Sequence, residues 1–396
     1  MLYKIRTKCN VSSLTYKYYN TFQAIPQKDW NSVNTNNCIF FSLPYIKILE
    51  QTLSENIEFN YIIFYNSKNL AVAFAITQLF IFNSDQLKPN DFPCKLGDTI
   101  TKKLIANMDI SVLTCGNLFA CGEYGFKYNE SLIDAKTAYE NLSKALRKFG
   151  KSDSVNKPSF LLFKEFWPTS FSESDQLELH DFRSFKIDVN MVLQLQNWTT
   201  FEDYLASMRT KFRTRAKTVF KKSAPLTVKK FTSQDIENYK HEISNLYSSV
   251  LENADFKLAK QNIATFKSLK NEFQTHFLFN GYFLQEKLVA FSTAFVLDDV
   301  LEANHIGIDY NFNKTYAIYQ RMLYDYVKIA MSKKVKELRL GRTAEIIKST
   351  IGAKPVDMKL YVRHRNSFSN TLLKPLVELI SPSEYEIRNP FKTQQT

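Results

Sequence analysis

Glycine and proline are both scarce in this chain. Only 9 glycines and 11 prolines occur among its 396 residues, whereas 44% of the residues are hydrophobic and 14% are aromatic. This composition excludes collagen-like and low-complexity chains, and it supplies enough apolar side chains for large cores. The length predicts two or three domains.

Cysteine is also rare, and no run of 18 apolar residues occurs anywhere. The cysteines show no paired metal-binding spacing, and the first twenty residues contain no continuous apolar segment like that of a secretion signal. We therefore expect a protein of the reducing cytoplasm, with no bound metal and no membrane-spanning helix. The five cysteines are Cys9, Cys38, Cys94, Cys115 and Cys121.

Acidic residues are missing from residues 204–234, which contain nine lysines and arginines. Much of the +13 net charge arises here, because residues 1–190 hold 21 basic and 19 acidic residues and residues 191–396 hold 31 and 20. A segment of this kind creates a local positive field that attracts phosphate-bearing partners.

Several common catalytic signatures are absent as well. The chain has no Gly-x-x-x-x-Gly-Lys-Ser/Thr phosphate loop, no Gly-x-Ser-x-Gly elbow, no His-Glu-x-x-His pair and no Gly-x-Gly-x-x-Gly turn. The sequence therefore argues against P-loop nucleotide hydrolysis, α/β-hydrolase chemistry, zinc proteolysis and a dinucleotide-binding site.

Two distant segments follow the same pattern. Residues 60–83 and 281–309 each read as apolar strands joined by polar turns, and NLAVAFAI in the first matches KLVAFSTAF in the second. This similarity predicts two copies of one α/β (α+β) domain, each with a mixed, mostly antiparallel sheet flanked by helices. We place the first domain at 1–190, the second at 191–370 and a C-terminal tail at 371–396.

The second half supplies the order in which its elements follow one another. Helical spacing runs through 200–223 and again through 317–334, on either side of the meander 281–309. A short strand, KELRL, then leads to GRTAEIIKSTIGAKP at 341–355, and the strand DMKLYVRHR follows at 357–365. We expect a short helix at 344–351 and assign all these elements to the second domain.

This order, together with the residues that carry it, resembles the GNAT superfamily of N-acyltransferases. The closer likeness is to the tandem branch that includes the FemABX-like aminoacyltransferases. It rests on the basic helix YLASMRTKFRTRAKTVFKKS, on LEANHIGID with the helix after it, and on LRLGRTAEIIKSTIGAKP followed by KLYVRHR. In the first half, CGNLFACGEYGF is also similar.

The resemblance implies transfer of an acyl group from a carrier to an amine, with the carrier as a co-substrate and no permanently bound cofactor. GNAT enzymes usually hold the pyrophosphate of coenzyme A on a Gln/Arg-x-x-Gly-x-Gly/Ala loop, where backbone N–H groups face the phosphates. The corresponding stretch here, residues 309–322, has no glycine. Besides acyl-CoA, the conceivable donors are therefore aminoacyl-tRNA, as in FemABX-like relatives, and acyl carrier protein.

Three candidate binding residues lie in the glycine-flanked stretch. Arg342 follows a strand directly and is suited to hold a phosphate or carboxylate. Thr343 is placed to cap the next helix, and Lys348 to face a ligand from that helix. The alternative is a simple connection in which Lys348 pairs with Glu345 in solvent.

Further candidates lie along LEANHIGID. Strand alternation places Glu302 and Asn304 on one face and His305 on the other. His305 has a pKa suited to a general base, with Glu302 as the second choice. Asp309 closes the strand where the donor would pass. Burial of His305 in a core is the structural alternative.

Tyr361, on the last strand, is a candidate proton donor to the leaving group, with a core tyrosine as the alternative. Arg213 represents the basic helix, whose apolar stripe should pack inward. Residues 209–230 are a possible surface for tRNA or an anionic membrane. A second hypothesis is therefore a non-catalytic protein that binds nucleic acid or an anionic surface on the same scaffold; the oligomeric state is open.

Overall fold

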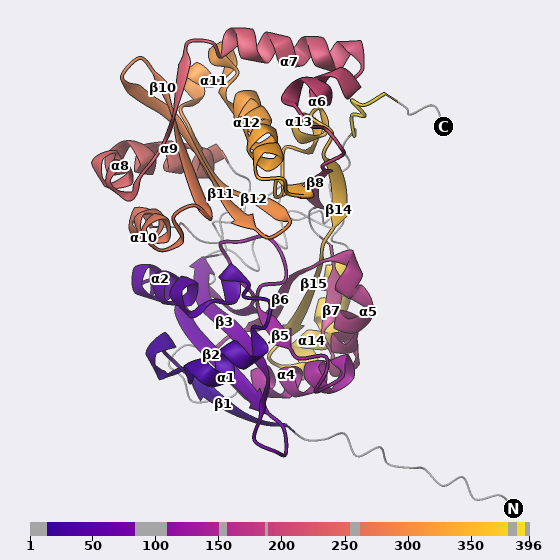
Figure 1. Cartoon of the computed structure of the whole chain (residues 1–396). Helices are drawn as coiled ribbons and strands as arrows, with labels where there is room; N and C mark the ends of the chain where they lie inside the picture. The colour runs from indigo at the N-terminus through magenta and orange to yellow at the C-terminus, as the bar shows by residue number, and fades with distance from the viewer. Residues whose placement is uncertain are drawn as a thin grey trace, which may run out of the picture.

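The computed structural model describes residues 14–83, 109–149, 157–186, 189–253, 262–378 and 386–392. Two units lie end to end, one drawn mainly in indigo and magenta and the other mainly in orange (Figure 1). Each unit contains one sheet with helices packed against it.

The first sheet has the strand order β1-β2-β3-β4-β6-β15-β7, with β5 paired to β3. Every neighbouring pair is antiparallel except β4 and β6, which run parallel. The strands are β1 (Thr15–Tyr19), β2 (Glu58–Tyr65), β3 (Ala71–Asn83), β4 (Asp109–Cys115), β5 (Phe126–Tyr128), β6 (Phe160–Phe166), β15 (Lys359–His364) and β7 (Arg183–Phe185).

The second sheet has the order β9-β10-β11-β12-β13-β8-β14, again with one parallel pair, between β12 and β13. Apart from β5, which has no counterpart in the second sheet, the two sheets therefore match strand for strand, and the similar segments noted in the sequence occupy equivalent places. The strands are β9 (Leu226–Lys230), β10 (Phe277–Leu284), β11 (Lys287–Leu297), β12 (Val300–Ile308), β13 (Glu337–Arg339), β8 (Val189–Gln194) and β14 (Lys354–Asp357).

The two units exchange a strand. β15 comes from the end of the chain yet lies between β6 and β7 of the first sheet, whereas β8 precedes the second unit and lies between β13 and β14. The sequence places residues 357–365 in the second domain, and the structure corrects this for β15. The register explains the difference, because Tyr361 pairs with Phe163 on one side and with Ser184 on the other.

Helices cover both sheets. In the first unit they are α1 (Gln27–Val33), α2 (Leu43–Leu53), α4 (Ala135–Phe149), α5 (Phe171–Ser174) and α14 (Ser367–Glu378). In the second they are α6 (Phe201–Ser207), α7 (Thr210–Lys222), α8 (Ser233–Asn238), α9 (Lys240–Asn253), α10 (Ile263–Phe273), α11 (Tyr310–Tyr316), α12 (Ile318–Ser332) and α13 (Glu345–Ser349).

The predicted single basic helix is in fact two helices. Met208 has an extended backbone (φ −78°, ψ 150°) and forms a β-bridge with Phe391, and this bridge separates α6 from α7. The N–H of Arg209 donates to the carbonyl of Pro390 at 2.8 Å. A segment of the predicted C-terminal tail therefore pairs with this break and interrupts the helical hydrogen bonds.

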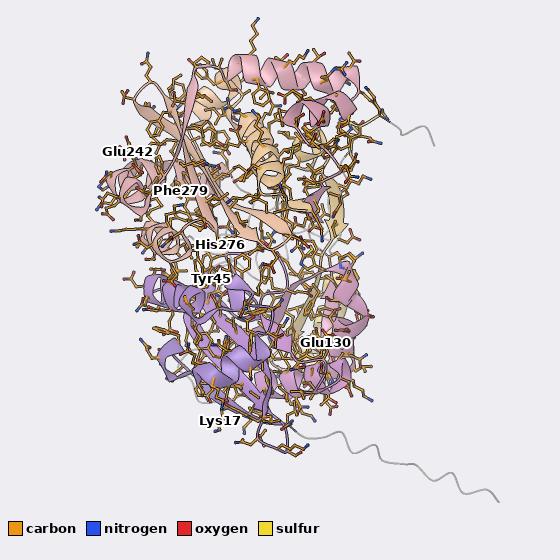
Figure 2. The ribbon with its side chains drawn as sticks, viewed as in Figure 1. Lys17, Tyr45, Glu130, Glu242, His276 and Phe279 are labelled. Carbon is orange, nitrogen blue, oxygen red and sulfur yellow. The ribbon has the colours of Figure 1, made fainter. Side chains whose placement is uncertain are left out.

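The two units share part of one hydrophobic core. Phe40 and Tyr45 of the first unit pack against Phe295 of the second, with ring centroids 5.0 and 6.0 Å away. Tyr45 is drawn at this boundary in Figure 2. The Thr52 and Thr265 hydroxyls, on α2 and α10, lie 2.8 Å apart. Among the described residues, no helix is long and apolar enough to cross a bilayer.

Candidate functional site

The site lies where the only parallel pair of the second sheet separates. β12 and β13 pair at three positions, and the last pair is Glu302 with Arg339. β13 then ends, while β12 continues to Ile308 beside β11. The edge of β12 that faced β13 is no longer paired to that strand, so the sheet forks immediately beyond Glu302.

Glu302 is a buried carboxyl group at the start of this fork. Its side chain is 1% exposed, and the Tyr124 hydroxyl of the first unit donates to its Oε2 at 2.9 Å. Burial raises the pKa of Glu302 to about 7, although Arg339 and the Tyr124 hydrogen bond act in the opposite direction. A carboxyl group with a pKa in this range is partly ionised near neutral pH, as a general acid or base requires.

Arg339 brings positive charge to the same place. Its guanidinium lies over the Trp167 ring, 4.2 Å from the centroid, and it forms an ion pair with Glu337. Trp167 belongs to the first unit, so this stacking also joins the two units at the fork.

A loop of the first unit, residues 116–125, covers the fork. The Asn304 amide donates to the carbonyl of Phe119 at 3.0 Å, and Tyr124 holds Glu302 as described above. The N–H of Gly122 donates to Glu165 at 2.9 Å. Gly125 allows this path, because a Cβ there would lie 2.3 Å from the N atom of Gly116.

Arg342 reaches across the boundary to a buried ion pair. Its Nη1 lies 3.1 Å from Oε1 of Glu165, and Lys164 Nζ lies 2.5 Å from Oε2 of the same carboxylate. Burial disfavours the charged carboxylate, but Lys164 and Arg342 outweigh it and lower the pKa of Glu165. Arg342 itself is 30% exposed. It is thus held by the first unit with part of its side chain in solvent.

The turn that carries Arg342 has a left-handed backbone on either side of it. Gly341, Thr343 and Ala344 have φ values of 70°, 64° and 54°, which are unfavourable for the two non-glycine residues. Lys348 donates to the carbonyls of Gly341 and Arg342, at 3.2 and 2.5 Å. These bonds stabilise the turn.

These positions differ from what the sequence predicts for Thr343 and Lys348. The N-cap of α13 is Ala344, with no side-chain capping bond, because the left-handed turn moves Thr343 away from the capping position. Lys348 is 4% exposed, so it is neither part of a solvent pair with Glu345 nor directed to an open surface.

His305 does not lie on the face opposite Glu302, where strand alternation predicts it, because the register of β12 with β11 shifts between Ser292 and Ala294. Its aromatic neighbours belong to the same apolar cluster as Phe295, the residue paired with Glu302. Its ring packs against Tyr247 and Phe266, and its Nδ1 lies 3.3 Å from the Tyr247 hydroxyl. Burial lowers the pKa of His305 to about 4, so the ring is neutral at physiological pH.

Tyr361 lies in the first sheet, away from the fork, because β15 is exchanged. Its hydroxyl donates to Asp175 at 2.6 Å and lies 2.8 Å from the Ser174 hydroxyl. Arg213 lies on α7, a helix at the outer edge of the second unit (Figure 1). The structure therefore sets Glu302 and Asn304 against the loop 116–125, and Arg342 against Glu165, at the boundary of the two units. His305 packs against α9 and α10, and Tyr361 and Arg213 lie on other elements.

The far end of the fork is where a GNAT pyrophosphate loop is expected. Here α11 follows β12, with Asp309 as its N-cap accepting from the N–H of Asn311. The side-chain oxygen of Asn313 accepts from the N–H of Tyr319 in the first turn of α12, at 3.0 Å. Side-chain oxygens therefore already accept hydrogen bonds from backbone N–H groups that a pyrophosphate would need. The residues present do not fit that mode of binding.

Sequence reasoning missed the residues that the first unit contributes. Lys164, Glu165 and Tyr124 lie far from the fork in sequence. One signal was available: Lys164 and Glu165 interrupt the apolar strand FLLFKEF, where an adjacent pair of charges is unexpected in a buried sheet. Within the described residues, no group of three His, Cys, Asp or Glu side chains is placed to hold a metal ion.

Comparison with known proteins shows the fold. FemX is matched with a TM-score of 0.52 at 8% identity, over 87% of this chain and 96% of that one. A tandem GNAT protein from the clavulanic acid biosynthesis pathway is matched at 0.51 and 8%, over 89% and 99%. A conserved protein of unknown function from Bacteroides thetaiotaomicron is matched at 0.50 and 10%, over 88% and 99%.

No family model matches the sequence, and no curated protein matches it. At 8–10% identity, the structural matches show the architecture of the chain and do not identify a substrate.

Proposed function

We propose that this chain, which has the tandem GNAT fold, is a cytoplasmic N-acyltransferase that moves an acyl group from a carrier to an amine. The observation that carries the proposal is Glu302, a carboxyl group with a pKa of about 7 buried at the start of the fork. A general base with a pKa near the working pH is efficient, because it is sufficiently ionised and still basic enough to accept a proton.

The chemistry requires little else from the protein. The amine nitrogen attacks the carbonyl carbon of the donor, so that a C–N bond forms and the bond to the carrier breaks. The ionised Glu302 accepts the proton that the amine loses, and the carrier leaves as a thiol or hydroxyl after taking up a proton. Arg339 and Arg342 supply positive charge beside the negative charge that develops.

Tyr124 has a gating role in this proposal. Its hydroxyl occupies Oε2 of Glu302, and Glu302 is 1% exposed. An amine therefore reaches Glu302 only when the loop 116–125 moves. We infer that the first unit presents the acceptor side and that the donor approaches along β12 from the α11 end.

Three donors remain in this proposal: acyl-CoA, aminoacyl-tRNA and acyl carrier protein. The arrangement of α11 and Asn313 weighs against a pyrophosphate held as in ordinary GNAT enzymes. A carrier that is recognised through a larger surface does not need that loop.

The test compares Glu302→Gln with Glu242→Gln, which changes an exposed glutamate on the outer surface of the second unit (Figure 2). Native mass spectrometry with acetyl-CoA, long-chain acyl-CoA and charged tRNA identifies the donor. Transfer from that donor to hydroxylamine, a small surrogate amine, is then measured. We expect Glu302→Gln to lower the rate about 100-fold or more and Glu242→Gln to leave it unchanged. An unchanged rate in Glu302→Gln disproves the role of Glu302.

A second candidate function is a binding protein on an inactive scaffold, favoured by the closure of the fork by residues 116–125. It predicts salt-sensitive binding of an anionic partner that persists when Arg342 is changed and weakens when Arg209, Arg213 and Arg215 are neutralised. No acyl group would leave any donor.

A further inference from the structure

We infer that the exposed face of α7 is a docking surface for an acidic carrier protein that brings the acyl group to the fork on a flexible arm. This inference rests on the proposed acyl transfer and names the kind of donor. It is based on three observations: the positive charge of α7, the burial of its apolar face in the second unit, and its position beside α11.

The outer face of α7 is a regular array of cations and small hydroxyl groups. Two rows of basic side chains flank a row of three exposed threonines at four-residue spacing. One row holds Lys211, Arg215 and Lys222, the other holds Arg213, Lys217 and Lys221, and the row between them holds Thr210, Thr214 and Thr218. Within the part of the chain that the structure describes, none of these six cations forms an ion pair, so their charge is available to a partner.

The apolar face of α7 is already used inside the protein. Phe212, Ala216 and Val219 are buried in the core of the second unit. No large apolar side chain of α7 is exposed, so the helix has nothing to insert among lipid acyl chains. It also presents no exposed aromatic ring on which a nucleic acid base would stack. These absences favour a protein partner over a membrane or single-stranded RNA.

The spacing of the charges fits a helix of such a protein. The two cationic rows run along α7 with the short threonines between them. An acidic helix lying along α7 over the threonines would bring its carboxylates near both rows. Charge complementarity of this kind steers association and sets orientation.

The position of α7 connects the surface to the reaction site. α7 lies across the end of the second unit and packs beside α11 and α12 (Figure 1). α11 begins directly after β12, whose opposite end carries Glu302. The seven residues from Glu302 to Ile308 span about 20 Å in an extended strand. A carrier docked on α7 would therefore need an arm of about this length to place its thioester at Glu302.

The experiment uses purified acyl carrier protein, loaded with a fatty acyl group as the thioester of its phosphopantetheine arm. Binding to the full-length protein is measured by fluorescence anisotropy at low and physiological salt. The variant Lys211→Gln/Arg215→Gln/Lys217→Gln should bind about tenfold more weakly. The matched control, Lys47→Gln/Lys68→Gln/Lys136→Gln, removes three exposed cations from the first unit and should bind like the wild type.

Two further arms separate this inference from the proposed function. Glu302→Gln should bind the loaded carrier normally and fail to transfer its acyl group. If the wild type binds the loaded carrier normally but transfers no acyl group, the proposed function is wrong and the docking surface is still supported. Equal binding by the α7 variant and the wild type overturns the docking surface. So does binding of bulk tRNA or phosphatidylglycerol vesicles without binding of the carrier protein.

Discussion

At the scale of single residues, the site contains two carboxyl groups whose surroundings shift their pKa values in opposite directions. Glu302 and Glu165 are both 1% exposed. Burial without a directly paired cation raises the pKa of Glu302, whereas Lys164 and Arg342 outweigh burial and lower that of Glu165. Glu302 is thus suited to exchange protons, and Glu165 to remain charged as an anchor for Arg342.

The pKa of Glu302 predicts how the rate depends on pH. Only the ionised carboxylate accepts a proton, so kcat/KM should rise about tenfold per pH unit below pH 7 and level off above it. Tyr124→Phe removes a hydrogen bond that lowers the pKa of Glu302, so it should move the inflection to higher pH. A profile that is flat between pH 5 and 8 would contradict the assignment of Glu302 as the base.

The Lys164–Glu165 pair predicts a large effect on stability. Glu165→Ala leaves Lys164 buried without its carboxylate, which should lower the free energy of unfolding by about 3–5 kcal/mol. Lys144→Ala breaks an exposed ion pair with Glu140 and should cost less than about 1 kcal/mol. Urea unfolding of the two variants measures both values. Similar midpoints for the two would show that the buried pair is not needed for folding.

At the scale of elements, the loop 116–125 and the turn 341–344 meet at the boundary and close the fork. The loop depends on Gly125, because a Cβ there would lie 2.3 Å from backbone atoms of Gly116. The turn depends on Lys348, which binds two of its carbonyls. Neither segment is a regular helix or strand, so each is held in place by specific contacts.

Gly125→Ala should displace the loop and expose half-buried Cys121. The alkylation rate of Cys121, followed by peptide mass mapping, should rise by about tenfold or more, because a 2.3 Å contact with backbone is relieved only by movement of the chain. Gly341→Ala is the matched comparison. Its Cβ would have space, with the nearest atom 3.9 Å away, so only the left-handed backbone is penalised, by about 1 kcal/mol. Equal alkylation rates in the two variants would count against a tightly packed loop.

At the scale of the whole molecule, the exchanged strands make each unit depend on a distant part of the chain. Among the described strands, β15 pairs with both β6 and β7, and β8 pairs with both β13 and β14. The exchanged strands also link the two units, and residues of the first unit contact the fork of the second.

Ending the chain at residue 357 should therefore damage the first unit rather than the second. β6 would lose its antiparallel partner, and its amides at Phe160–Phe166 should exchange with deuterium about 100-fold faster or more. A chain that ends at residue 385 keeps β15 and is the control. Unchanged protection of β6 in the shorter chain would mean that the first sheet is stable without β15.

Local pattern was sufficient to predict the element types and the duplication. Both depend on periodicity over a few residues, so the strands at 60–83 and 281–309 and the helix at 317–334 follow from the sequence. The alternation predicted from Glu302 to His305 was wrong, because the register shift of β12 leaves no period-2 signal in the sequence. The apolar stripe of α7 packs inward as expected, because burial of Phe212 and Val219 favours one face of the helix.

Tertiary structure decided what no local pattern contains. The break at Met208 requires Phe391, the place of Tyr361 requires the exchange of β15, and the burial of His305 requires α9 and α10. The anchoring of Arg342 and the pKa of Glu302 depend on Glu165 and Tyr124, which are 177 and 178 residues away in sequence. Hydrogen bonding and burial act over a few ångströms in space, so a site built from two units becomes apparent only when the chain is folded.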